Sequence, residues 1–172
     1  YAEEDDYFTQ SLRMAQKIQG TSKLKFPKNY EDLVEKYSKE CEIDPTIIYS
    51  LIRSESFFDP DVSSMAGAIG LTQLMDFTAN DIARKLKISE YSLTDPETNI
   101  QFGTYYLKNM ISRLENDYLN GFFAYNAGIT RVRRWLNTSI LGFGKKSTMP
   151  ADLFLETLPY TETREYGRKL VS

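Results

Sequence analysis

The stretch "PTIIYSLIRSES", residues 45–56, joins a strong helix start to an apolar stripe that a carboxylate interrupts. Asp44 precedes Pro45, and a capping residue followed by proline at the first helical position predicts that a helix begins here. The stripe consists of Ile47, Ile48, Leu51 and Ile52. Glu55 follows three residues after the last of them, so a helix places it on the same face. A helix that buries this face would be expected to carry another leucine at that position.

Composition limits the classes of protein that this chain can be. It has 172 residues and 41% hydrophobic residues, which is ordinary usage for one globular domain. With 24 acidic and 21 basic residues, the net charge of −3 gives no electrostatic case for a nucleic-acid partner or an anionic membrane surface. The sequence contains no apolar run of about 18 residues, so we expect no transmembrane segment.

Histidine is absent from the chain. This excludes Ser-His-Asp and Cys-His catalytic machinery and argues against a zinc site, so we expect neither a metal nor a cofactor. A carboxylate with a perturbed pKa is then the natural candidate for proton transfer near neutral pH. Cys41 is the single cysteine, which we interpret as an inert, buried thiol.

Hydrophobic periodicity predicts a mostly α protein. The segment 59–69 is small and polar and is the one place where a short hairpin is expected. Gly103 lies on the apolar face of a long predicted helix, which suggests a close helix crossing there. A polar connector covers 21–29 and a loop covers 138–149. The predicted helices are 5–19, 30–41, 45 to the Asp59-Pro60 stop, 70–86 with an interruption near Asp76, 96–114, 117–127, 130–137, 150–157 and 161–171.

The position of Glu55 suggests a general acid. Partial burial disfavours the charged form of a carboxyl group, and so do the carbonyl dipoles at the C-terminal end of a helix. Both effects raise the pKa, which is the property that the acid of a glycoside-cleaving enzyme needs. The structural alternative is that Glu55 pairs with Arg53 or with a lysine at the helix end. Position alone does not separate these two interpretations.

Four further motifs follow Glu55-Ser56 in order. They are "SSMAGAIGLTQLM" at 63–75, "NIQFGTYYL" at 99–107, "AYNAG" at 124–128 and "ETLPYTETREY" at 156–166. Together they resemble the catalytic domain of soluble lytic transglycosylases, which are bacterial relatives of goose-type lysozyme. The resemblance covers about residues 30–171 and implies a lysozyme-like α fold with a substrate cleft. We therefore predict a catalytic domain over 30–172 and an N-terminal helical extension over 1–29.

The resemblance also implies the residues of the site. Glu55 corresponds to the catalytic acid. Departures from the family pattern are Thr72, where methionine is common, and Asp76, where proline is common. Taken singly, most of the matching residues have a structural alternative: a turn serine, a polar helix residue, a core aromatic, a helix cap or a surface charge. The predicted substrate-binding residues are Ser56, Ser64, Gln73, Met75, Tyr125, Asn126, Glu156 and Tyr160.

The mechanism implied by the resemblance needs only one carboxylate. A retaining glycosidase ordinarily uses two, about 5 Å apart, but the sequence offers only Asp59 and Asp61 as a second, and neither is convincing. In the family, the glutamate acts as acid and then as base, and peptidoglycan is cleaved without water to leave 1,6-anhydromuramoyl ends. Two alternatives stay open: a hydrolytic muramidase or chitinase, and a non-catalytic glycan-binding or assembly module on the same fold.

Location and partners follow from the same resemblance. The expected partner is the peptidoglycan glycan strand, and the expected location is the periplasm or another extracytoplasmic part of the bacterial envelope. The chain starts at Tyr1 without methionine or a signal-like segment. We interpret it as a processed form or an excised domain whose targeting segment is not present here. Envelope protein partners stay open.

Overall fold

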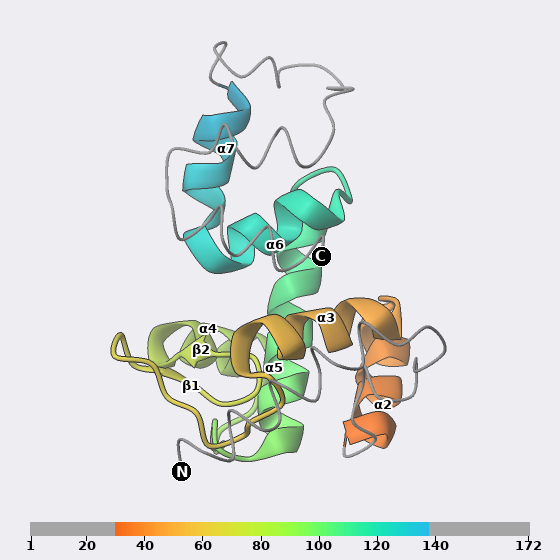
Figure 1. Cartoon of the computed structure of the whole chain (residues 1–172), viewed down its shortest axis with the longest axis vertical. Coiled ribbons are helices and arrows are strands. Elements are labelled where there is room, and N and C mark those ends of the chain that lie inside the picture. The colour runs from red at the N-terminus through yellow and green to blue at the C-terminus, as the bar shows by residue number, and fades with distance from the viewer. Residues whose placement is uncertain (1–29, 138–172) are drawn as a thin grey trace, which may run out of the picture.

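The computed structural model describes residues 30–137, which form six helices and one short β-hairpin (Figure 1). The predicted segments 5–19, 138–149, 150–157 and 161–171 lie outside the described residues, so they stay predictions. The mostly α prediction is confirmed. In chain order the elements are α2 (Glu31–Cys41), α3 (Pro45–Ser56), β1 (Ala68–Ile69), β2 (Leu74–Met75), α4 (Asp76–Leu86), α5 (Pro96–Ser112), α6 (Tyr118–Ala127) and α7 (Ile129–Asn137).

Aspartates begin three of these helices, as the capping pattern predicts. The side chains of Asp44, Asp95 and Asp117 accept hydrogen bonds of 2.8 to 2.9 Å from backbone N–H groups in the first turns of α3, α5 and α6. Proline occupies the first turn of both α3 and α5. The caps satisfy donors that a helix start leaves without an intrahelical partner, so local sequence defines these boundaries.

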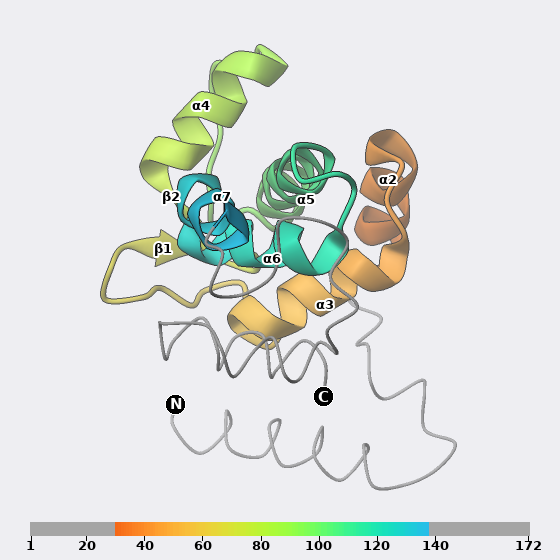
Figure 2. The same cartoon turned by 90° about the horizontal axis from the view of Figure 1, so that it is seen from above.

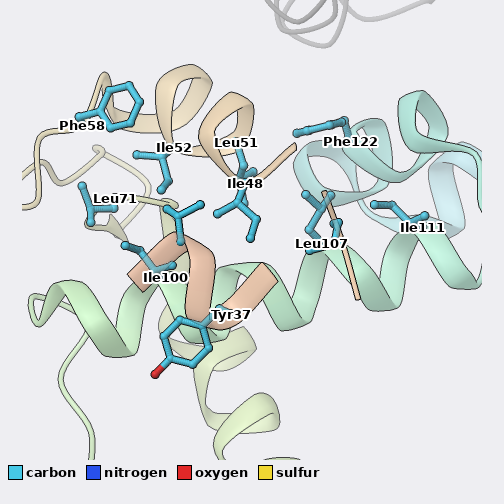
Figure 3. Close-up of a cluster of buried hydrophobic side chains, with 12 residues drawn as sticks. Tyr37, Ile48, Leu51, Ile52, Phe58, Leu71, Ile100, Leu107, Ile111 and Phe122 are labelled. Carbon is cyan, nitrogen blue, oxygen red and sulfur yellow. The ribbon is translucent and has the colours of Figure 1, made fainter. Parts of the chain in front are cut away.

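Helix α5 lies at the centre of the described fold. It packs against α2, α4 and α6, and Figure 2 looks roughly along it, with α2 on one side and α4 on the other. Helix α3 crosses beside it and directs Ile48, Leu51 and Ile52 into a core shared with Ile100 and Leu107 of α5 (Figure 3). All five of these side chains are fully buried. The apolar stripe of residues 45–56 therefore packs as its spacing predicts. Within residues 30–137, no helix combines the length and the apolar character needed to cross a bilayer.

The segment 70–75 was predicted to be helical, and this is wrong. It forms the turn and second strand of an antiparallel hairpin in which Ala68 lies opposite Met75 and Ile69 opposite Leu74. Gly70 has φ +75° and Gln73 has φ +49°, both in the left-handed region that an α-helix does not use. An antiparallel bridge pairs Ser63 with Ile69, so the hairpin predicted near 59–69 is present, and β2 adds a second antiparallel pairing to β1 beyond that range. Helix α4 begins at Asp76, near the expected interruption.

The close helix crossing predicted at Gly103 is also wrong. A Cβ at Gly103 would overlap the side chain of Thr72, so this glycine admits the hairpin turn and not another helix. The close helix approach occurs instead between α5 and α6. There a Cβ at Gly121 would overlap the side chain of Ile111. Both glycines lie on faces where a larger side chain would separate the packed elements.

Candidate active site

Glu55 lies in the last turn of α3, where the fully buried stripe of Ile48, Leu51 and Ile52 reaches the edge of the core. Its side chain is half-buried, and its Oε1 atom is buried from solvent. The predicted position of Glu55 on the apolar face at the C-terminal end of its helix is therefore confirmed. Both the burial and the helix end disfavour a negative charge at this position.

The chain turns sharply immediately after Glu55. Phe57 and Phe58 have φ values of 53° and 70°, which place two bulky residues in succession in the left-handed region. Such conformations cost about 1–3 kcal/mol each and persist where surrounding contacts fix them. Here the backbone N–H of Phe57 donates to Arg53 at 3.2 Å, and Phe58 is buried against Tyr49, with ring centroids 6.4 Å apart. The turn fixes the end of the helix that carries Glu55.

Ser56 supports this turn from inside the protein. It is buried, and its hydroxyl donates to the carbonyl of Ile52 and accepts from the backbone N–H of Phe58, both at 3.1 Å. These contacts use the hydroxyl proton within the protein. The structure therefore does not support direct substrate binding by Ser56. It gives this serine a role in shaping the chain next to Glu55.

Ser64 lies in an exposed turn before β1. Its hydroxyl accepts from the backbone N–H of Ala68 at 3.0 Å, and its own N–H donates to the Ala68 carbonyl at 2.9 Å. Ser64 is thus a turn serine, as the structural alternative predicts. The hydroxyl still has its own proton to donate, so the turn role is compatible with a contact to a ligand.

Gln73 lies at the end of the hairpin turn and holds it together. Its side-chain Nε2 donates to the carbonyls of Val62 and Gly70, each at 3.0 Å. An amide NH₂ group has two protons, and both are used here. Gln73 was expected to offer both a donor and an acceptor to a sugar amide. Only its side-chain carbonyl oxygen, an acceptor, is still available for that contact. Met75 follows on β2, half-buried and opposite Ala68.

Tyr125 and Asn126 lie in the last turn of α6. The hydroxyl of Tyr125 donates to the backbone carbonyl of Thr72 at 2.8 Å, and its ring packs edge-on against Tyr106 with centroids 5.1 Å apart. Asn126 is exposed, and Gly128 caps the helix by donating its N–H to the Ala124 carbonyl, so the alternative of Asn126 as a helix cap is wrong.

Glu55 and Tyr125 act on each other electrostatically although 70 positions separate them in the sequence. Burial raises the pKa of Tyr125 well above its ordinary value, and the negative charge of Glu55 raises it further. A charge has this effect on a buried hydroxyl only from close by. The site thus joins the end of α3 to the end of α6, across from the hairpin turn that Tyr125 contacts.

Sequence reasoning gave no role to Asn99, which anchors this turn. Asn99 is 1% exposed, and all the hydrogen-bonding capacity of its side-chain amide is used by Thr72, Ile69 and Leu93. A signal was available, because Asn99 precedes Gly103 by four residues and thus shares the predicted apolar face. A polar residue on such a face is informative when it is buried. Glu156 and Tyr160 lie outside the described residues, so their predicted roles stay predictions.

Comparisons with known proteins agree with this arrangement. The family model described as "Transglycosylase SLT domain" matches residues 32–141. The soluble lytic murein transglycosylase of Escherichia coli K12 is 37% identical over 152 residues, which are 86% of this chain and 23% of that protein. The membrane-bound lytic murein transglycosylase C of Sodalis glossinidius is 32% identical over 162 residues, which are 82% of this chain and 44% of that protein.

Two solved structures also match across the chain. The 70 kDa soluble lytic transglycosylase from Escherichia coli has a TM-score of 0.78 and 34% identity, covering 99% of this chain and 28% of that one. The lytic transglycosylase Slt of Pseudomonas aeruginosa, solved as an inactive glutamate-to-glutamine mutant, has a TM-score of 0.76 and 30% identity, covering 99% and 27%.

The chain spans about a quarter of the length of the soluble lytic transglycosylases that it matches. The match to their helical arrangement confirms the predicted lysozyme-like fold. The family model covers more than half of the chain, and it includes Glu55, the hairpin and the Tyr125 turn. We conclude that this chain belongs to the transglycosylase SLT domain family.

Proposed function

We propose that this chain is a lytic transglycosylase that cleaves the β-1,4 bond between N-acetylmuramic acid and N-acetylglucosamine in peptidoglycan, without water. The observation that carries this proposal is the half-buried carboxyl group of Glu55 at the C-terminal end of α3, beside Tyr125. The names of the relatives, which include soluble and membrane-bound lytic murein transglycosylases, support the same substrate and reaction.

Glu55 is the catalytic residue in this proposal. The burial of Oε1 and the carbonyl dipoles at the end of α3 both favour the protonated acid over the carboxylate. A proton is therefore available for the leaving group near neutral pH. The inactive glutamate-to-glutamine mutant of the Pseudomonas aeruginosa relative supports a requirement for a glutamate in this family.

The reaction proceeds in two steps with Glu55 in both. Glu55 first donates its proton to the bridging oxygen, and the bond from that oxygen to the muramic acid C1 breaks. The carbonyl oxygen of the substrate's own N-acetyl group stabilises or attacks the positive C1. The Glu55 carboxylate then takes the proton of the muramic acid 6-hydroxyl, whose oxygen bonds to C1 and closes the 1,6-anhydro ring. The acid is thereby regenerated, and neither a second carboxylate nor water is required.

We place the glycan strand beside the end of α3, the hairpin and the end of α6, in the cleft that the family resemblance predicts. Gln73 accepts a hydrogen bond through its carbonyl oxygen, and Tyr125 offers its aromatic body to a sugar face. Ser64, Met75 and Asn126 complete the contacts that the described residues supply. Glu156 and Tyr160 add to them by family resemblance. Ser56 acts indirectly, by fixing the turn after Glu55.

The proposal extends to organisation and location. Residues 30–172 are the catalytic domain, and residues 1–29 are an extension outside it. Because the substrate is the bacterial cell wall, the protein works in the periplasm or elsewhere outside the cytoplasm.

A relative was solved in complex with bulgecin A, and we expect the same compound to bind this chain. An increase in melting temperature on adding bulgecin A would support this, and no shift at saturating concentration would contradict it.

Mass spectrometry of muropeptides tests the proposed reaction. Purified peptidoglycan digested by the full chain should yield fragments with 1,6-anhydromuramoyl ends, each one water lighter than the corresponding reducing-end fragment. Reducing ends alone would indicate a hydrolytic muramidase. Binding to peptidoglycan without any soluble product would indicate a non-catalytic glycan-binding module.

A further inference from the structure

The hairpin and the bridge that precedes it form a small antiparallel sheet with one face on the core. Ser63 pairs with Ile69, and Ile69 pairs with Leu74. Residues opposite one another in such a sheet project their side chains from the same face. Leu74 is 1% exposed, and Ile69 packs against the cluster that contains Leu74 and Phe102. The residues that alternate with these therefore project from the opposite, outer face.

Three residues lie side by side across this outer face. Ala68 lies opposite Met75 in the register. Ser64 lies opposite Ala68, since its backbone N–H donates to the Ala68 carbonyl at 2.9 Å. Ser64 is exposed, whereas Ala68 and Met75 are half-buried. We call Ser64, Ala68 and Met75 the outer row, and its middle position holds the smallest of the three side chains.

Hydrogen bonds fix the spacing of the outer row. The backbone N–H of Ala68 donates to the Ser64 hydroxyl at 3.0 Å, so both backbone groups of Ala68 bond to Ser64. The turn between them is tight, because Gly67 donates its N–H to the Ser64 carbonyl at 2.9 Å and has φ +88°. Strand pairing holds Met75 on the other side of Ala68. The three side chains therefore form one surface and do not move independently.

The outer row belongs to the part of the molecule that carries the candidate acid. In both Figure 1 and Figure 2 the hairpin lies next to the C-terminal end of α3, which carries Glu55. The proposed function assigns substrate contacts to Ser64 and to Met75, at the two ends of the row. A ligand that contacts both ends has to pass over the alanine between them.

We propose that Ala68 is a further substrate-contact residue, whose small side chain lets the glycan strand lie directly on the sheet between Ser64 and Met75. This inference rests on the proposed function for the identity of the ligand. The chemistry of the row suits a sugar, which has polar hydroxyl groups around an apolar C–H face. The Ser64 hydroxyl has a proton to donate, and the methyl and thioether groups beside it are apolar. A larger side chain at position 68 would hold the strand away from both neighbours.

The test enlarges Ala68 without weakening the strand. Valine and threonine have the same shape and favour strands, so Ala68→Val and Ala68→Thr should keep the hairpin. Both should raise the KM for soluble, uncrosslinked peptidoglycan strands by about 10-fold or more, and by similar factors, because the effect depends on bulk and not on polarity. The kcat should change little, since Ala68 has no group that transfers a proton.

A matched control makes the same change outside the row. Ala66 is exposed at the tip of the turn, and Ala66→Val should leave the KM unchanged. Ala68→Ser adds a single atom and should have a smaller effect than Ala68→Val. Melting temperatures of all variants show whether a rise in KM comes from loss of the fold.

A second variant detects the contact without added bulk. The cysteine introduced by Ala68→Cys, in a Glu55→Gln background that does not consume the strands, should react with a thiol reagent. Saturating peptidoglycan strands should slow this reaction at least several-fold, whereas the rate at Cys41, on α2, should stay the same. Equal rates at position 68 with and without strands would overturn the proposal even if Ala68→Val fails to fold.

Co-sedimentation with insoluble peptidoglycan separates this inference from the proposed function. Ala68→Val should weaken binding by about the factor by which it raises the KM. Wild type that binds peptidoglycan without releasing 1,6-anhydro products would refute the proposed reaction, while weaker binding by Ala68→Val would still support the contact. Normal cleavage by wild type, with unchanged KM and binding in Ala68→Val, would refute the contact alone. An equal rise in KM for Ala66→Val would also refute it.

Discussion

Replacing Asn99 by alanine should remove much of the stability of this domain. The change deletes a side chain that makes four hydrogen bonds and is 1% exposed. The Thr72 hydroxyl can turn to the Asn99 backbone carbonyl, which lies 3.2 Å away. The Thr72 N–H and the carbonyls of Ile69 and Leu93 cannot compensate in this way, since each loses a partner inside the protein.

The magnitude follows from these three groups. A buried polar group left without its partner costs about 1–3 kcal/mol. Water that enters the site and the higher helix propensity of alanine both reduce the total cost. For three such groups we therefore expect a loss of about 3–5 kcal/mol in the free energy of unfolding. A domain of this kind has about 5–15 kcal/mol in total, so the variant should be close to unfolding.

Urea unfolding monitored by circular dichroism measures this loss. Asn109→Ala is the matched control, because Asn109 is half-buried on the same helix, and its loss should stay below about 1 kcal/mol. If Asn99→Ala lost less than about 1 kcal/mol, or no more than Asn109→Ala, the hydrogen bonds of Asn99 would not hold the turn.

Three further predictions concern other parts of the molecule. Thr104→Val should raise the free energy of unfolding by about 1 kcal/mol, because the Thr104 Oγ1 is buried without a hydrogen-bond partner in the described structure. Thermal melting would detect this gain in stability, and a clear decrease in melting temperature would contradict the prediction. Hydrogen bonds from the backbone N–H and then the side chain of Thr98, in order of their effect, lower the pKa of Asp95. The charged Asp95 therefore adds stability that is fully present above its unfolded pKa of about 4 and disappears as the pH falls through its lower folded pKa. Asp95→Asn should lose less stability than wild type between pH 5 and pH 2, and identical losses would argue against the cap. EDTA should leave the rate of peptidoglycan cleavage unchanged, since the chain has no histidine and the proposed chemistry uses one carboxyl group; a loss of rate restored by added metal would contradict this.

Local signals in the sequence were sufficient for most of the helices. Asp44-Pro45 and Asp95-Pro96 combine a capping side chain with a proline that tolerates the first turn, so α3 and α5 begin where the sequence indicates. The stripe that ends at Glu55 packs as its period requires. These features depend only on residues close together in the chain, which is why they could be predicted.

The hairpin turn could not be predicted in the same way. Residues 70–75 have a helix-like pattern, but Asn99, 27 positions after Thr72, supplies the hydrogen bonds that hold the turn. The proximity of Glu55 and Tyr125 likewise depends on how α3 and α6 pack around α5. For Ser56, the family resemblance predicted a ligand contact, whereas the left-handed turn at Phe57 and Phe58 uses its hydroxyl. Such contacts follow from tertiary structure and not from spacing.

The central claim is that Glu55 delivers and then recovers the proton. Glu55→Gln keeps the size of the side chain but removes its acid, so peptidoglycan turnover should fall by about 100-fold or more. The fold should be preserved. Stability should stay equal or increase above the folded pKa of Glu55, because a carboxylate at this helix end is unfavourable. Glu40→Gln, at an exposed position on α2, is the control.

The most direct test is to quantify 1,6-anhydromuropeptides released by wild type, Glu55→Gln and Glu40→Gln, with melting temperatures measured on the same samples. We expect anhydro products from wild type and Glu40→Gln, almost none from Glu55→Gln, and a melting temperature of Glu55→Gln at or above that of wild type at neutral pH. Substantial anhydro product from Glu55→Gln would place the acid elsewhere. A marked drop in its melting temperature would instead identify Glu55 as a charged partner in a structural ion pair.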